Sequence, residues 1–158
     1  IYANNDKIDE IKFEDVASLR NLTSKEINKS NFETILESYK LEDELGEFQG
    51  QWEPNEIQNI KELQNEIIKG GDNFWGDHIT IQLLSKKLKI NFVILNSNDE
   101  SEELSYTTVE INGNKNYIIL YYLNNCHFKL VGKFDGKKIQ VIFRKIPAEI
   151  KEVLLIGK

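Results

Sequence analysis

The sequence predicts an α+β fold, with a helical N-terminal arm followed by a mostly antiparallel sheet. Up to Leu88, apolar residues recur every three or four positions, as they do along one side of a helix. Beyond Leu88 the chain consists of short runs of β-branched and aromatic residues, separated by Asn-Gly and Asp-Gly pairs that favour tight turns. A chain whose helices come first and whose strands follow is typical of α+β domains.

Three helices are expected before residue 70. Apolar spacing predicts a short helix within residues 13–20 and a second over residues 27–39. The clearest helical pattern covers residues 54–68, because it opens on a proline suited to a first helical turn and ends at Gly70-Gly71.

A fourth helix should begin at Asp77, whose carboxylate can accept hydrogen bonds from the free amides of the first turn. Its inward side would carry Ile81, Leu84 and Leu88. The helical arm therefore ends where the strand-like sequence begins.

The strands are expected as one interior strand and two pairs. Residues 90–95 are apolar enough for an interior strand, and residues 106–111 and 117–123 should form a hairpin through Asn112-Gly113-Asn114. Residues 127–131 and 138–144 should form a second pair around Asp135-Gly136. The tail over residues 147–155 fits either a closing helix or a final strand.

Composition restricts the function classes. With 158 residues, the chain has the length of a single domain spanning residues 1–158, and its net charge of −6 is not the footprint of a nucleic-acid or lipid-surface binder. Its apolar runs are far shorter than the roughly 20 residues of a membrane span. A lone cysteine, Cys126, cannot form an internal disulfide, so a cytoplasmic location is expected, or a host cytosol for a protein of a virus or intracellular pathogen.

Of the two histidines, His127 is the better candidate for chemistry. His78 lies at a helix start, where a capping or exposed role is common. His127 follows the turn residues Asn124-Asn125 and opens a strand, so its imidazole should lie at the rim of the sheet. The acidic runs have no ligand spacing, and neither a metal nor a cofactor site is expected.

Three blocks of the chain resemble the ovarian-tumour (OTU) family of deubiquitinases, which are papain-like cysteine proteases. Trp75-Gly76-Asp77, followed by a helix and the strand 90–95, is similar to the family's Trp-Gly block. Residues 119–122 with Asn125-Cys126-His127-Phe128 are similar to its histidine block, and Leu19-Arg20 to a segment before its helical arm. The blocks occur in the family's order along nearly the whole chain.

The resemblance implies an OTU/papain-like fold and a thiolate–imidazole mechanism acting on ubiquitin or a ubiquitin-like protein. In the family, cysteine attacks the carbonyl of the isopeptide bond, while histidine keeps it ionised and later protonates the leaving lysine amine. His127 would be that base and general acid. Phe128 would point to the opposite face and pack in the core, because successive strand residues alternate sides.

The nucleophile is expected outside the sequence. Cys126 directly precedes His127 in an extended segment, so its sulfur should project to the other face. The family's nucleophile lies in an Asp-Gly-x-Cys segment at the start of a helix, and no such segment occurs here. The chain opens on Ile1 and contains no methionine, which favours a piece of a longer protein whose cysteine lies just before Ile1.

The residue that orients the histidine is also atypical. Family members often carry Asp or Asn two positions after the histidine, where this chain has Lys129, and a lysine cannot accept that hydrogen bond. Asn125 is the expected replacement, with Asn124 or an acid upstream as alternatives. Two other functions stay open: a catalytically inactive ubiquitin-binding relative, and an unrelated α+β protein-interaction domain. The oligomeric state is not predicted.

Overall fold

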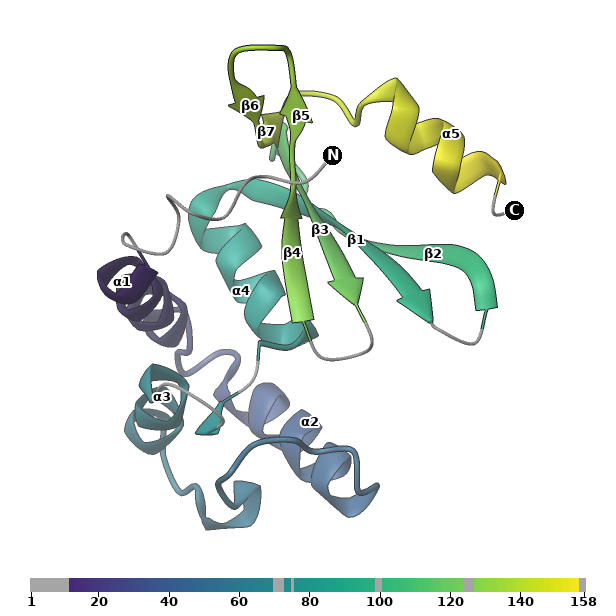
Figure 1. The fold of residues 1–158 in the computed structure, drawn as a ribbon. Coiled ribbons are helices and arrows are strands. Elements are labelled where there is room, and N and C mark those ends of the chain that lie inside the picture. Colours follow the sequence, from purple (N-terminus) through teal and green to yellow (C-terminus); the bar gives the residue numbers. More distant parts are fainter. Residues whose placement is uncertain (1–11, 70–72, 75, 99–100, 124–126, 157–158) are drawn as a thin grey trace. The chain divides into compact units, whose positions relative to one another are not determined.

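The computed structural model describes residues 12–69, 73–74, 76–98, 101–123 and 127–156 (Figure 1). The chain divides at Lys87/Leu88 into two compact units. We call the described residues up to Lys87 the helical unit and those from Leu88 onward the sheet unit. The fold is mixed α+β with a mostly antiparallel sheet, as the sequence predicts.

The helical unit contains four α-helices and a 3-10 turn among its described residues. They are α1 (Lys12–Lys25), α2 (Phe32–Glu44), η2 (Pro54–Glu56), α3 (Ile60–Ile68) and α4 (His78–Leu88). Every predicted helix is therefore present, although three of them have other boundaries, and α1 runs five residues beyond the predicted end.

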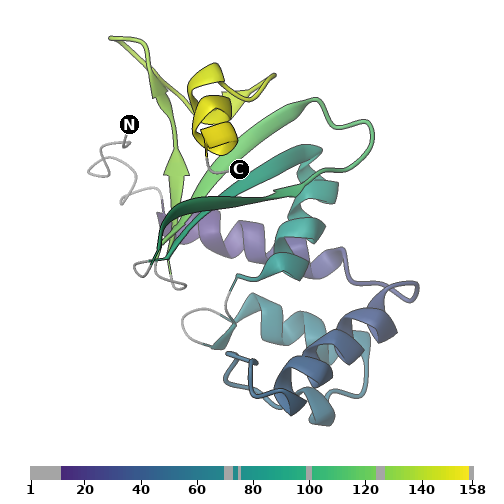
Figure 2. The ribbon, with the colours of Figure 1, turned by 90° about the vertical axis from the view of Figure 1, so that its right-hand side faces the viewer.

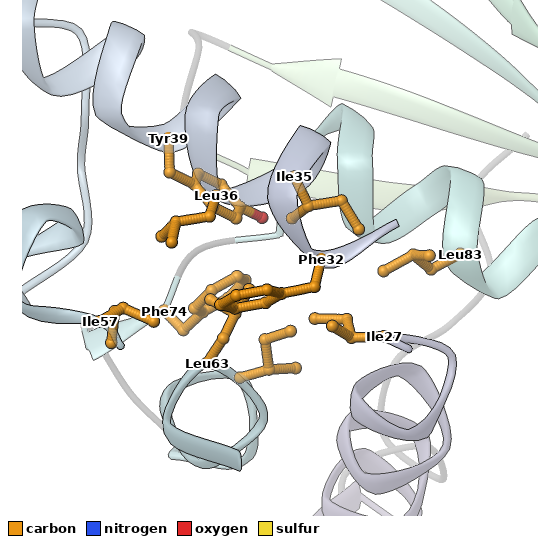
Figure 3. Packing of buried hydrophobic residues seen from close by; sticks show 10 residues of the cluster. Ile27, Phe32, Ile35, Leu36, Tyr39, Ile57, Leu63, Phe74 and Leu83 are labelled. Carbon is orange, nitrogen blue, oxygen red and sulfur yellow. The ribbon is translucent and has the colours of Figure 1, made fainter. Parts of the chain in front are cut away.

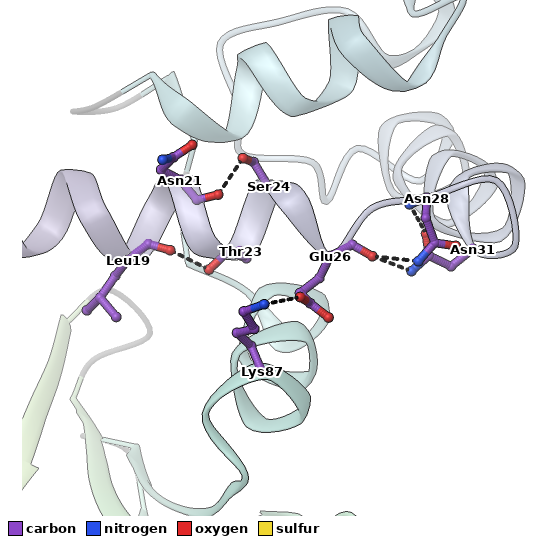
Figure 4. A network of polar contacts seen from close by, with 8 residues as sticks. All are labelled: Leu19, Asn21, Thr23, Ser24, Glu26, Asn28, Asn31 and Lys87. Carbon is purple, nitrogen blue, oxygen red and sulfur yellow. Dashed lines mark hydrogen bonds and ion pairs between the residues drawn. The ribbon is translucent and has the colours of Figure 1, made fainter.

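The helix expected over residues 27–39 begins only at Phe32, because asparagine side chains hold the preceding turn. The backbone N–H of Asn28 donates to Oδ1 of Asn31 (2.8 Å), and the N–H of Ser30 donates to Oδ1 of Asn28 (2.9 Å). Figure 4 shows Asn28 and Asn31 facing each other beyond the end of α1, with Glu26 paired to Lys87 of α4 at 3.2 Å. Side chains that occupy backbone groups in this way compete with helix formation.

The helix expected from Pro54 begins six residues later, at Ile60, because Pro54 opens only the short turn η2. Asn59 caps α3: its Oδ1 accepts a hydrogen bond from the N–H of Glu62 (3.0 Å), and the Glu62 carboxylate accepts one from the N–H of Gln58 (2.7 Å). This reciprocal arrangement satisfies two amides that would otherwise lack partners at the helix start.

The helix start at Asp77 is confirmed. Oδ1 of Asp77 accepts a hydrogen bond from the N–H of Thr80 (2.8 Å), and Oγ1 of Thr80 accepts one from the N–H of Asp77 (2.9 Å). Ile81 is buried as expected. The other two expected inward residues are not: Leu84 is half-buried and Leu88, at the end of the helix, is 37% exposed, whereas Leu83 is buried.

The core of the helical unit joins α2, α3 and the segments around them. Figure 3 shows Phe32 and Phe74 at its centre with Leu63 close to them. The buried apolar members are Ile27, Phe32, Ile35, Leu36, Tyr39, Ile57, Leu63, Ile67, Phe74 and Leu83. Burying such side chains contributes roughly 1.5–3 kcal/mol each, which fixes the positions of the elements within this unit.

The main sheet has the strand order β2-β1-β3-β4, with β7 also pairing with β3. Its strands are β1 (Ile90–Asn98), β2 (Ser101–Val109), β3 (Asn116–Leu123), β4 (His127–Val131) and β7 (Ile142–Phe143). β1 is parallel to β3, and the other pairings are antiparallel. The expected interior strand is confirmed, because β1 has a partner on each side and residues 91–95 are all buried.

The hairpin expected between residues 106–111 and 117–123 is wrong, because β1 lies between these two strands. The turn itself forms: Gly113 has φ of +94°, and the N–H of Asn114 donates to the carbonyl of Ile111 (3.0 Å). The loop 110–115 carries the chain from the end of β2 past the start of β1 to the start of β3.

Asn91 explains this crossing. It is 3% exposed in the interior strand, yet its Oδ1 accepts the N–H of Ile111 (3.0 Å) and its Nδ2 donates to the carbonyl of Asn114 (3.3 Å). A buried carboxamide needs such partners, so the side chain holds the loop across the start of β1.

The second predicted strand pair is also wrong in its partners. The Asp135-Gly136 turn forms, with Gly136 at φ of +95°, but it joins only the short strands β5 (Lys133–Phe134) and β6 (Ile139–Gln140). β4 pairs with β3 instead, because the long apolar β3 provides more cross-strand side-chain contacts than the two-residue strand β6. After Pro147 the tail forms helix α5 (Ala148–Ile156), which resolves the open choice in favour of a helix.

Helix α5 lies against one face of the sheet (Figure 2). Leu154 and Ile150 pack on Val93, Leu95 and Ile119, which project from β1 and β3. This core fixes which face of β3 and β4 is covered and which residues emerge at the ends of the strands.

Candidate functional site

His127 is the first residue of β4 and lies opposite Leu123, the last residue of β3. Because β1 and β3 are parallel, their carboxyl ends share one edge of the sheet, and His127 enters the sheet at that edge. The residue is exposed. The sequence-based expectation of an imidazole at the sheet rim agrees with this placement.

The strand register identifies the neighbours of His127. Ser97, Leu123 and His127 are aligned across three adjacent strands, and cross-strand neighbours point to the same side of a sheet. Two pairs further along, and so on the same face, Tyr121 lies opposite Lys129, and its hydroxyl is 2.6 Å from Oγ of Ser97. His127 therefore shares a face and an edge with a hydroxyl pair.

Ser97 and Tyr121 are absent from the sequence-based site because their proximity depends on the parallel pairing of β1 with β3. The residues are 24 positions apart, and no local pattern links them. The available signal is the serine that follows the apolar run of β1, since a polar residue there marks the strand end. Each hydroxyl of this pair can donate to the other or to a bound group.

Phe128 does not enter the core. It points to the face opposite His127, as strand alternation requires, but it is 39% exposed. Its ring stacks on Tyr122 across the strand pair, with centroids 4.4 Å apart and planes inclined by 24°. The expectation of burial is wrong. Phe128 is the second residue of β4, and among the described residues the only ring that packs against it is Tyr122 of β3.

The other expected members of the site are incompletely placed. Asn124, Asn125 and Cys126 lie outside the described residues. Lys129 is aligned with His127 on the same face of β4 and is exposed. In the described part of the chain, no three or more His, Cys, Asp or Glu residues gather as a metal-ion site.

Arg20 links three segments within the helical unit. Its guanidinium donates to the carbonyls of Ile67 (3.2 Å), Lys69 (3.0 Å) and Phe74 (3.1 Å). Burial lowers the pKa of Arg20. The side chain thus fastens α1 to the end of α3 and to the residue that precedes the Trp75-Gly76-Asp77 block, of which Trp75 lies outside the described residues.

The described helices include none that combines the length and apolar character needed to span a bilayer. Comparisons with models of protein families and with curated proteins found no match for this chain.

Proposed function

We propose that this chain belongs to a cysteine-dependent isopeptidase of the OTU type, which removes ubiquitin or a ubiquitin-like modifier from proteins in the cytoplasm. The observation that carries the proposal is the position of His127, exposed at the first residue of β4 where β1 and β3 both end. An imidazole at this rim is accessible to a substrate and is held by strand pairing on a covered sheet.

In the proposed reaction His127 serves both as a base and as an acid. Its neutral ring accepts the proton of a cysteine thiol, and the thiolate attacks the isopeptide carbonyl carbon to form a tetrahedral oxyanion. The imidazolium then donates the proton to the departing lysine amine, which leaves a thioester. Water attacks the thioester after giving its proton to His127, and the cysteine is released with the modifier's carboxylate.

The cysteine of this reaction is supplied by residues outside 1–158. Cys126 adjoins His127 in the chain, and adjacent residues of an extended segment project to opposite sides. Asn125 is the proposed hydrogen-bond acceptor that orients the His127 ring. Lys129 cannot take that role, since an ammonium group only donates.

A pair of histidine variants tests the proposal in a form of the protein that includes the upstream segment. His127→Ala should lower kcat/KM for a fluorogenic ubiquitin C-terminal amide by at least about 100-fold, because general acid–base catalysis contributes about 10²–10⁴. His78→Ala is the matched control, since His78 is exposed on α4, where Nε2 of its ring lies 2.9 Å from Nε2 of Gln82. Full activity of His127→Ala, or an equal loss in both variants, would overturn the assignment.

Lys129 favours one alternative, a ubiquitin-binding relative without catalysis. A cation stands where the family often carries the acceptor that orients the histidine, and a ring without an acceptor is poorly held for proton transfer. That protein would bind ubiquitin reversibly, with no thioester formed and no fluorogenic product released.

A further inference from the structure

The helical unit contains a hollow of about 480 Å³ beside the segment that joins α2 to α3. Its apolar lining comes from Phe48, Trp52 and Ile57. The polar and glycine residues around it are Asp43, Gly50, Gln51, Glu53, Glu56, Glu66 and Lys69. The sheet-rim site around His127 uses none of these residues.

The aromatic wall is held firmly. The Trp52 ring stacks on Phe74 with planes inclined by 8° and centroids 5.9 Å apart, and Phe48 meets it edge-on at 4.9 Å. Gly50 permits this packing, because a Cβ there would lie 2.5 Å from both Cζ of Phe48 and Nε1 of Trp52. The indole N–H of Trp52 is buried and has no hydrogen-bond partner among the described residues. The rings around it thus pack closely although this donor is left unsatisfied.

The charges around the hollow are unbalanced. Glu66 is neutralised locally: its carboxylate accepts hydrogen bonds from Nζ of Lys69 (2.7 Å) and from Nδ2 of Asn73 (3.0 Å). Asp43, Glu53 and Glu56 also line the hollow. None of the ion pairs among the described residues involves their carboxylates. The hollow therefore keeps an excess of negative charge beside a rigid aromatic wall.

We propose that this hollow receives an arginine side chain presented by a partner protein. A guanidinium is planar and weakly hydrated, so it can lie against aromatic rings, and its five N–H groups can reach carboxylates spread around a rim. A lysine ammonium is a compact, strongly hydrated charge that does not exploit the aromatic wall in the same way. The proposal does not rest on the isopeptidase function.

An NMR titration of the intact chain with blocked tripeptides tests this. Acetyl-Gly-Arg-Gly-amide should produce saturable shifts at the indole N–H of Trp52 and the amide of Gly50. The analogue with citrulline, which has nearly the same shape without the charge, should bind at least about tenfold more weakly, and added salt should weaken the arginine peptide further.

Charge-removing variants locate the binding. Glu53→Gln and Glu56→Gln should each weaken the arginine peptide by about two- to fivefold, as expected for partly exposed ion pairs, and both are exposed residues whose replacement spares the core. Glu33→Gln, an exposed change on α2 outside the hollow, should have no effect.

Three results would overturn the proposal. One is equal binding of the arginine and citrulline peptides, and another is tighter binding of a lysine peptide. The third is the absence of saturable shifts at Trp52 up to about 50 mM peptide, since a specific site for a charged side chain should reach millimolar affinity.

Discussion

Replacing Asn91 with alanine should loosen the loop that crosses from β2 to β3. The change removes the acceptor of the Ile111 N–H and the donor to the Asn114 carbonyl. Hydrogen bonds of this kind contribute about 0.5–1.5 kcal/mol each, and the longer bond to Asn114 belongs at the low end of that range. The expected loss is about 2 kcal/mol in the free energy of unfolding the sheet unit.

Hydrogen exchange at the Ile111 amide measures this effect where it arises. A loss of about 2 kcal/mol in the free energy of opening corresponds to about 30-fold faster exchange of that amide. Asn112→Ala, an exposed change in the same loop, is the matched control and should leave the exchange rate nearly unchanged. If Asn91→Ala alters Ile111 exchange less than about twofold, the loop is held by something other than Asn91.

Asn91→Asp adds a dependence on pH. In the variant, the carboxylate can still accept a hydrogen bond from the N–H of Ile111, but it would also face the Asn114 carbonyl. The native Asn91 is only 3% exposed at this position, so the folded pKa of the new Asp should be raised. A raised folded pKa means that stability is fully present below the unfolded value of about 3.9 and is lost as the pH rises. Asn91→Asp should therefore be less stable than Asn91→Ala at neutral pH and recover in acid.

Three further changes probe other local features. Lys89 has a φ of +54°, so Lys89→Gly should stabilise the protein by about 0.5–1 kcal/mol in urea unfolding, whereas Lys86→Gly, inside α4, should destabilise it by about 1 kcal/mol. Burial and the carboxylates of Asp77 and Glu47 raise the pKa of Glu42, so Glu42→Gln should stabilise the protein at neutral pH. This gain in stability should vanish as the pH falls below the pKa of Glu42 in the unfolded chain. Glu44→Gln, an exposed change on the same helix, should alter stability little. Arg20→Lys should cost about 1–3 kcal/mol, because one ammonium cannot serve three carbonyls in the guanidinium geometry, and an unchanged urea midpoint would contradict that role.

The sequence was sufficient for elements whose signals are local. Helical spacing located the four helices before the sheet, the Asp77 cap marked the start of α4, and the apolar run from residue 90 formed the interior strand. Helix boundaries failed where side chains form bonds that spacing does not reveal, at Asn28 with Asn31 and at Asn59 with Glu62. The Asn-x-x-Glu pattern at residues 59–62 was a readable start signal that outranks Pro54.

Strand partners could not be predicted from turn residues alone. Asn112-Gly113-Asn114 does form a turn, but turn chemistry does not exclude a third strand between the two that the loop joins. The polar Asn91 inside an apolar run was the hint, since a buried carboxamide must find partners, and the loop provides them. The identity of those partners depends on residues about 20 positions away, which periodicity does not reach.

The same distinction applies to the candidate site. The rim position of His127 follows from a turn and a strand start, both local signals. The neighbouring pair Ser97 and Tyr121 follows only from the parallel register of β1 and β3. The burial of Phe128 was predicted from alternation, which gives the face of a side chain but says nothing of what covers that face.

Mapping the adduct of a ubiquitin probe tests the central proposal most directly. The probe carries a cysteine-reactive group in place of the C-terminal carboxylate, and it should be applied to a form of the protein that includes the upstream segment and to residues 1–158 alone. We predict one adduct in the longer form, on a cysteine upstream of Ile1, which His127→Ala abolishes and His78→Ala leaves intact. An adduct on Cys126, or labelling that persists in His127→Ala, would contradict the roles proposed here for both residues.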